Sequence, residues 1–452
     1  MQHLEKSIAG FEAESDRHKF ALARMAWVGL TKINQHSHFP DAMSFSFKEL
    51  DAAFGRSKFK EVNLRLDLFT FTPNWSKDDS YTRGYMFSGR AREAIQDYLD
   101  SRSGTVLTRL IMADGKALKK VPAGVASKDK SGVTTRAWVN ARSLDRVAVN
   151  LTAIDRLKRE LSGACETHRS EEVALGRSDT PETAAIERTV AMISKIQLLS
   201  RTDVCGVGVM AHHYEEAQSG RLYPVGISLA SAQSVVKDAA LEGHWEYDIS
   251  NCHFAIASQM ASKHGYECVA ITNYLRNKDS VRLEISKGAG INKEQAKKCL
   301  LALLYGARAS KWKDTAIARE IGEAATERLV AVPEFKALMV EIRGAREWIL
   351  SKCERTARGF VRNAFGKSIS DAATMEQQFA HLLQGVEAKA LQAAINAYPD
   401  DIVLVQHDGF VSRRRLDLAD LGEVIRAATG YSLALKEECL EARSEDYFAT
   451  HL

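Results

Sequence analysis

The segment from residue 401 to residue 412, Asp-Ile-Val-Leu-Val-Gln-His-Asp-Gly-Phe-Val-Ser, constrains the fold more than any other part of the chain. Two apolar, β-prone runs flank an Asp-Gly pair, which is a strong signal for a β-hairpin. Such a hairpin holds His407 and Asp408 at its tip, on backbone that cannot swing away. A carboxylate that binds a metal ion needs a rigid mounting of this kind. A plain surface hairpin has the same pattern.

A second acidic residue lies where a short β-prone run passes into a helical one. Asp248 stands in Trp-Glu-Tyr-Asp-Ile-Ser-Asn-Cys-His-Phe, residues 245–254, and an apolar helical run follows as far as Met260. An acid at this junction can project beside the acid of another strand, or it can cap the following helix. From about residue 200 onward, short β-prone runs alternate with long helical patterns, which favours an α+β fold.

The third feature is a helical pattern over residues 293–306, Lys-Glu-Gln-Ala-Lys-Lys-Cys-Leu-Leu-Ala-Leu-Leu-Tyr-Gly. At about 100° per residue, every fourth residue from Lys293 lies close to one stripe of the helix, which therefore carries Lys297, Leu301 and Tyr305 as well. Lysines spaced in this way can bind a triphosphate. An amphipathic surface helix has the same pattern.

In their order and spacing, these three elements resemble the signature motifs of the single-subunit polymerase superfamily, which joins phage and mitochondrial RNA polymerases with family A DNA polymerases. In that superfamily an Asp ends the first palm strand, a fingers helix carries a Lys and later a Tyr-Gly pair, and a His-Asp pair lies at the tip of a palm hairpin. The matching residues are Asp248, Lys297, Tyr305, Gly306, His407 and Asp408. The resemblance implies a right-hand polymerase fold, with palm and fingers over residues 200–452.

Two further parts of the sequence are similar to the same superfamily. Gly-Arg-Leu-Tyr-Pro at residues 220–224 resembles a segment of the RNA polymerases in which the Arg contacts template or hybrid. The segment at residues 359–366 and the Gln-Gly pair that begins at Gln384 resemble segments of the family A DNA polymerases. The resemblance implies template contacts for Arg221 and Gln384. Ala217 departs from the RNA polymerase motif, which usually has Asp or Thr at this place.

The resemblance also implies a two-metal mechanism. Asp248 and Asp408 would hold two Mg²⁺ ions, one activating a 3′-hydroxyl and one bridging the triphosphate of the incoming nucleotide. Lys297 and Lys293 would neutralise the charge that develops on the phosphates. Lys293 replaces the Arg that is usual at the start of the fingers motif, so the charge is kept while bidentate geometry is lost.

Sugar choice depends on the residues beside the 2′ position. Tyr305, followed by Gly306, would lie beneath the incoming nucleotide, and His407 would position the terminal one. Family A DNA polymerases place a Glu where His253 stands here, and an imidazole can block the 2′-hydroxyl or donate a hydrogen bond to it. Leu301 resembles the aliphatic choice of the RNA polymerases. We therefore favour RNA synthesis, by a small RNA polymerase or primase, over synthesis by a family A-like DNA polymerase.

Residues 1–100 are expected to form a helical domain. Helical patterns at residues 48–54 and 59–68 are separated by Gly55, and an extended stretch follows at residues 81–87. This unit resembles a winged helix-turn-helix in outline, although an ordinary helical subdomain also fits. If the polymerase-like half were inactive, this unit and the basic segment of residues 101–160 would be the working surface of a DNA-binding replication initiator.

Positive charge is concentrated in residues 101–160, which hold 13 Lys or Arg and 5 Asp or Glu in a chain with a formal net charge of +4. Such a concentration is expected of a surface that tracks phosphates, and its candidate template contacts are Lys116, Lys119 and Lys120. We assign residues 101–180 to this basic segment and to a linker, because the stretch from residue 166 to residue 183 is polar.

The remaining composition excludes several classes of protein. No stretch is long and apolar enough for a membrane span, and the first residues lack the pattern of a secretion signal. The 7 cysteines are scattered, with no C-x-x-C pair, which indicates neither a disulfide framework nor a structural zinc site. We expect a cytoplasmic enzyme whose partners are a DNA template, nucleoside triphosphates and its RNA product, with room for an accessory replication or transcription protein and no membrane partner.

Overall fold

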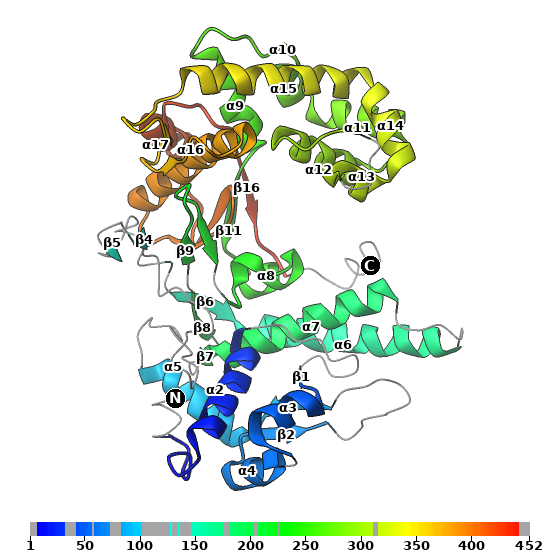
Figure 1. The fold of residues 1–452 in the computed structure, drawn as a ribbon, viewed down its shortest axis with the longest axis vertical. Coiled ribbons are helices and arrows are strands. Elements are labelled where there is room, and N and C mark those ends of the chain that lie inside the picture. Colours follow the sequence, from blue (N-terminus) through cyan, green and yellow to red (C-terminus); the bar gives the residue numbers. More distant parts are fainter. Residues whose placement is uncertain are drawn as a thin grey trace.

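Helices and short antiparallel sheets alternate along the chain in the computed structural model (Figure 1). The structure describes residues 7–31, 42–56, 58–72, 83–101, 127–128, 134–135, 144, 146–174, 180–202, 207–212, 214–224, 226–310 and 315–442. The fold mixes helix and sheet, in agreement with the predicted α+β class. Among the described helices, none combines the length and the apolar character that crossing a membrane would require.

A four-stranded antiparallel sheet lies in the middle of the molecule and collects strands from distant parts of the chain. Its strand order is β14 (Ile402–Val405), β15 (Gly409–Ser412), β11 (Trp245–Ile249) and β16 (Leu435–Cys439). Every residue of β14 and β15 is buried. Val405 and Phe410 pack into one hydrophobic core and Leu404 and Val411 into another, so both faces of this hairpin are covered. Burial on both faces explains why the two runs are continuously apolar rather than alternating.

The chain between β11 and β14 forms a helical arm and then returns to the sheet. The helices of the arm are α9 (Cys252–Ser262), α10 (Val269–Arg276), α11 (Lys278–Ala289), α12 (Lys293–Leu304), α13 (Ala316–Ile321), α14 (Glu323–Ala331) and α15 (Pro333–Lys352). The returning elements are β12 (Val361–Arg362), β13 (Ser368–Ile369) and α16 (Met375–Ala397), and α17 (Leu418–Thr429) packs on α16. The helices α11 to α14 lie at one end of the molecule (Figure 1).

Two long helices and a second sheet cover the face of the central sheet that carries Leu404 and Val411. The elements are β6 (Arg146–Asn150), α6 (Leu151–Ala174), α7 (Pro181–Leu199), β7 (Ser200–Thr202), β8 (Val207–Ala211) and α8 (Ser234–Ala240). The hairpin of β9 (Tyr214–Glu216) and β10 (Leu222–Pro224) follows β8. Ile154 of α6 and Ile193 of α7 share one hydrophobic core with Leu404 of β14. This layer and the central sheet therefore form one folded body.

The predicted linker is wrong for most of its length. Residues 166–174 form the end of α6, and the Glu172 carboxylate accepts a hydrogen bond from the N–H of Thr180, which caps α7. The stretch is polar because much of it faces solvent on a helix, not because it lacks structure. The shared core of α6, α7 and the sheet also places the start of the central body near residue 146, earlier than the predicted residue 200.

The N-terminal module, defined here as residues 7–101, has its own hydrophobic core. Its elements are α2 (Asp16–Thr31), β1 (Met43–Ser44), α3 (Phe47–Phe54), α4 (Lys58–Leu66), β2 (Phe69–Phe71), β3 (Gly84–Phe87) and α5 (Gly89–Ser101). The predicted pair of helices around Gly55 is confirmed. Between residues 102 and 143 of the basic segment the structure describes only β4 (Ser127–Lys128) and β5 (Thr134–Thr135), and the rest of the segment contains β6 and the start of α6. Lys116, Lys119 and Lys120 lie outside the described residues.

Candidate active site

Asp248 and Asp408 lie side by side at one end of the central sheet. Asp248 stands opposite Gly409 in the pairing of β11 with β15, and the N–H of Ile249 donates to the Asp408 carbonyl at 3.0 Å. Asp248 belongs to the strand and does not cap α9, because the cap position is Asn251, in the left-handed region at φ 47°. The structure thus brings together two acids that are far apart in the sequence.

The predicted hairpin is confirmed, with His407 and Asp408 at its tip. The N–H of Gln406 donates to the carbonyl of Gly409 at 2.9 Å and closes the turn. Gly409 is already the first residue of β15, where a Cβ would lie 2.5 Å from the carbonyl oxygen of Tyr247 on the neighbouring strand. The glycine therefore permits the close approach of β15, which Asp408 directly precedes, to β11, which carries Asp248.

The electrostatics of the two carboxylates fit a divalent cation. Asp248 is exposed, yet desolvation by the surrounding protein, together with the negative charge of Asp408, raises its pKa to about 6. Burial and the charge of Glu387 raise the pKa of Asp408 as well. Two neighbouring carboxylates whose pKa values are raised by each other or by further acids provide the oxygen donors and the negative charge that Mg²⁺ prefers. Asp248 and Asp408 are therefore suitable metal ligands.

Helix α12 carries the predicted stripe and starts where the sequence predicts. The Asn292 side chain accepts a hydrogen bond from the N–H of Gln295 in a capping box, which fixes the first turn. Lys293 is exposed at this end, and Leu301 is 39% exposed further along. The positive charge of Lys297 lowers the pKa of Asp248 and so counteracts part of the rise that desolvation causes, and the Lys297 ammonium also pairs with Glu294 at 3.3 Å.

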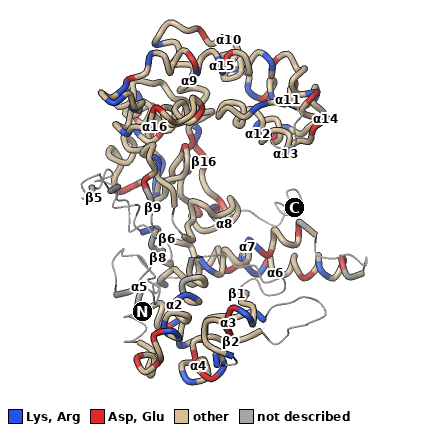
Figure 2. Tube along the Cα trace, viewed as in Figure 1, with Lys and Arg blue, Asp and Glu red and all other residues tan. Residues whose placement is uncertain are grey.

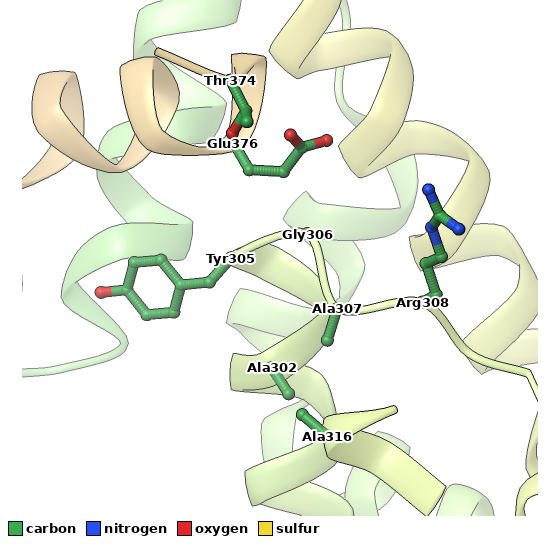
Figure 3. A pocket seen from close by; sticks show the side chains of 8 residues that line it. All are labelled: Ala302, Tyr305, Gly306, Ala307, Arg308, Ala316, Thr374 and Glu376. Atoms are coloured by element: carbon green, nitrogen blue, oxygen red, sulfur yellow. The ribbon is translucent and has the colours of Figure 1, made fainter. Parts of the chain in front are cut away.

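Tyr305 ends α12, and Gly306 turns the chain away from it. Gly306 has φ +86°, and a side chain at this position would collide with Glu376 of α16. A hollow of about 500 Å³ adjoins this turn, and Figure 3 shows Glu376 and Arg308 around it. The lining residues are Ala302, Tyr305, Gly306, Ala307, Arg308, Ala316, Thr374 and Glu376. The small residues and the turn leave space beside Tyr305 at the junction of α12 and α16.

A fully buried carboxylate, Glu387 in the middle of α16, connects several predicted residues. Its Oε1 accepts a hydrogen bond from Nε of Arg221 at 2.7 Å, and its Oε2 accepts one from Nη2 of the same guanidinium. Oε2 also lies 2.7 Å from Nε2 of His253, while Nδ1 of His253 is hydrogen-bonded to the Tyr305 hydroxyl. We call these four residues, Arg221, Glu387, His253 and Tyr305, the buried polar network.

The network extends toward the hairpin tip. The guanidinium of Arg221 lies 5.9 Å from the centre of the Tyr223 ring, and that ring lies 6.0 Å from the ring of His407, edge to face. Arg221 is only 8% exposed, so little of its surface is open to a template. In this conformation its guanidinium is engaged by Glu387.

The other segments singled out in the sequence pack around the same helix. The side-chain amide of Asn363, in the segment of residues 359–366, donates to the carbonyl of Ser219 at 2.9 Å and to that of His381 at 3.2 Å. These bonds join the turn before Arg221 to α16. Gln384 is half-buried on α16, about one turn before Glu387.

Cys252, His253 and Glu387 present donor atoms within 4.8 Å of one another, an arrangement that could hold a metal ion. Both oxygens of Glu387 already accept hydrogen bonds from Arg221. Burial also raises the pKa of the Cys252 thiol, which disfavours the thiolate that binds metals. The group is better explained as part of the buried polar network.

Glu387 and Tyr223 are the members of the site that the sequence analysis missed. Glu387 lies inside an ordinary amphipathic helix, where glutamates are common, and its partners lie far away in the sequence. The Gln-Gly pair at Gln384 identified the correct helix. The pair could not show that the side chain of Glu387, one turn later, points into the protein.

Comparisons with known proteins assign no family to the chain. No protein-family model matches it, and no curated protein sequence matches it. Among solved structures, the chain is similar to the polymerase domain of Pol1 from M. smegmatis in complex with DNA primer-template and dNTP. That similarity has a TM-score of 0.46 and 13% sequence identity, and it covers 92% of this chain and 80% of the other.

Proposed function

We propose that the protein is a template-directed nucleotidyltransferase that makes RNA from ribonucleoside triphosphates on a DNA template. The observation that carries the proposal is the adjacency of Asp248, on β11, and Asp408, at the tip of the neighbouring hairpin, with Lys297 of α12 within electrostatic reach of Asp248. Two carboxylates with excess negative charge and a lysine nearby suit the transfer of a nucleotidyl group from a triphosphate.

In the proposed reaction the 3′-oxygen of the growing strand bonds to the α-phosphorus of the triphosphate, the bond to the bridging oxygen breaks, and pyrophosphate leaves. Asp248 and Asp408 would hold two Mg²⁺ ions, which when bound supply activation of the 3′-hydroxyl and neutralisation of the leaving group. Lys297 and Lys293 bind the phosphate oxygens from α12. His407, exposed at the hairpin tip, contacts the terminal nucleotide.

Ribose selection follows from the proton positions in the buried polar network. An ionised carboxylate only accepts hydrogen bonds, so Nε2 of His253 carries the proton in its contact with Glu387. In a neutral imidazole Nδ1 is then an acceptor, and the Tyr305 hydroxyl donates to it. The phenol oxygen keeps its lone pairs and can accept a hydrogen bond from a 2′-hydroxyl. A deoxyribonucleotide offers no such donor.

DNA synthesis is the second candidate, and one observation favours it. The Tyr305 hydroxyl already has a partner in His253, and the imidazole is only 7% exposed. A polar network whose hydrogen bonds are all made without the substrate can exclude the 2′-hydroxyl of ribose sterically, which would favour deoxyribonucleotides.

A single assay tests the proposal and separates the candidates. Purified protein is given a single-stranded DNA template, with and without a primer, in Mg²⁺, and incorporation of ribonucleotides is compared with that of deoxyribonucleotides. RNA synthesis that stops on chelation supports the proposal. Preference for deoxyribonucleotides would make the protein a DNA polymerase, and no incorporation of either would exclude both functions.

A further inference from the structure

The N-terminal module has the element order and strand pairing of a winged helix-turn-helix. Helix α2 is followed by β1, α3, α4, β2 and β3, and the late strand β3 lies between β1 and β2 in the sheet. Met43 pairs with Tyr85 on one side of β3, and Phe69 pairs with Phe87 on the other. Gly55, at φ +94°, makes the turn between α3 and α4. In this architecture the second helix of the pair is the one that enters the major groove of DNA.

Helix α4 packs one stripe into the module and exposes the opposite face. The buried residues are Phe59, Val62, Asn63 and Leu66. The exposed residues are Lys58, Lys60, Glu61, Leu64 and Arg65. The side chain of Leu64 is 86% exposed, although an apolar side chain of this size is usually buried. Arg65 is held by Glu14 at 2.6 Å, which leaves the first two turns of the helix as the accessible part of this face.

The chemistry of this face suits the reading of base edges. Arg56 in the turn and the lysines Lys58 and Lys60 can donate hydrogen bonds to guanine or to phosphates. Glu61 can accept a hydrogen bond from the amino group of cytosine, and the Leu64 side chain can contact a thymine methyl group. A face that only tracks phosphates needs positive charge alone, whereas this one adds an acceptor and an apolar side chain.

The position of α4 leaves this face accessible. The helix lies at the end of the molecule opposite α11 to α14 (Figure 1), and Figure 2 shows basic and acidic residues interspersed along it. We propose that α4 is the recognition helix of a sequence-specific binding site for double-helical DNA. This site is separate from the candidate active site and goes beyond the proposed function, because it would select where on a duplex the protein acts.

Selection from a random-sequence DNA duplex library by the full-length protein tests this proposal. We expect the wild type to enrich one common sequence, and we expect Lys58→Glu with Lys60→Glu to lose the enrichment. Leu64→Ser should weaken binding to the selected duplex by a factor on the order of ten while leaving its salt dependence unchanged, because it removes an apolar side chain that meets a base and no charge. Lys278→Glu with Lys287→Glu on α11 is the matched control and should enrich the same sequence as the wild type.

The thermal melting curve of each variant verifies that the module remains folded. Failure of the wild type to enrich any sequence, or enrichment of the same sequence by the folded Lys58 and Lys60 variant, would overturn the proposal. Nucleotide incorporation on a single-stranded template is measured in parallel. Enrichment without incorporation would count against the proposed function only, and incorporation without enrichment would count against the recognition helix only.

Discussion

Nε2 of His253 and the carboxylate of Glu387 lie 2.7 Å apart inside the protein, and Nδ1 of the same imidazole is hydrogen-bonded to the Tyr305 hydroxyl. His253 comes from α9 and Glu387 from α16, so the contact also joins the helical arm to α16. In the proposed function Tyr305 contacts the substrate, and the fully buried Glu387 acts on it through His253. Glu387 is in this sense a positioning residue.

Replacing Glu387 tests that role. Glu387→Gln keeps the shape of the side chain but leaves the buried Arg221 without its counter-charge, which should destabilise the fold by about 3 kcal/mol. The amide can also donate to Nε2 of His253, which would reverse the hydrogen bond to Tyr305. We expect weaker discrimination between ribose and deoxyribose, measured as the ratio of the two kcat/KM values.

Glu423→Gln, an exposed carboxylate on α17 that pairs with Arg426, is the control for Glu387→Gln and should change neither stability nor sugar preference. A Glu387→Gln protein with reduced stability and an unchanged ratio would show that the contact is merely structural.

The two carboxylates should be indispensable for synthesis. Either Asp248→Asn or Asp408→Asn should reduce incorporation by several orders of magnitude, because each removes a charged ligand of the metal ions. Template binding should remain nearly intact. Asp401→Asn, which alters an acid at the other end of the same hairpin, is the control. Substantial activity in either variant would refute the assignment.

Variants at Tyr305 and His253 distinguish two mechanisms by which the protein could select the sugar. If Tyr305 accepts a hydrogen bond from the 2′-hydroxyl, Tyr305→Phe should admit deoxyribonucleotides while ribonucleotide incorporation survives. If His253 instead blocks the ribose, His253→Ala should admit ribonucleotides and Tyr305→Phe should matter little. The ratio of kcat/KM for the two sugars, measured for the wild type and both variants, distinguishes the two mechanisms.

The raised pKa of Asp248 predicts a gain in stability when its charge is removed from the metal-free protein. Because the pKa rises from 3.8 to about 6 on folding, the ionised carboxyl destabilises the fold at neutral pH. This penalty diminishes as the pH falls through about 6 and is absent below the unfolded value. In EDTA, Asp248→Asn should therefore melt at a higher temperature than the wild type at neutral pH, and the two should converge in acid. Equal melting temperatures at neutral pH would contradict the shift.

Three lysines of the basic segment that lie outside the described residues provide a further prediction. If residues 101–160 track a nucleic-acid backbone, neutralising Lys116, Lys119 and Lys120 should weaken template binding about equally for all sequences. The slope of log K against log salt should flatten by roughly one unit for each lysine that no longer neutralises a phosphate. A titration of binding against salt concentration measures both effects, and an unchanged slope would make the segment a solvated surface without a partner.

Local signals in the sequence predicted the local structure well. The apolar runs around His407 and Asp408 predicted the hairpin, and the stripe of every fourth residue from Lys293 to Tyr305 predicted α12, since turns and helical periodicity depend on residues close in sequence. The linker was misjudged because a helix with a broad solvent-exposed face has the composition of a loop. The network around Glu387 was not predictable, because it joins four segments whose contacts exist only after the chain has folded.

The hydrogen bond between Ile249 and Asp408 also has a consequence for how the protein is made on the ribosome. Strand β11 emerges early, but its neighbours β15 and β16 come from the last part of the described chain, with the whole helical arm in between. Pairing strands so distant in sequence requires closing a long loop and tends to be slow. The two acids can therefore meet only after the ribosome has passed β15 and β16, so nascent chains that end before these strands would lack the paired acids.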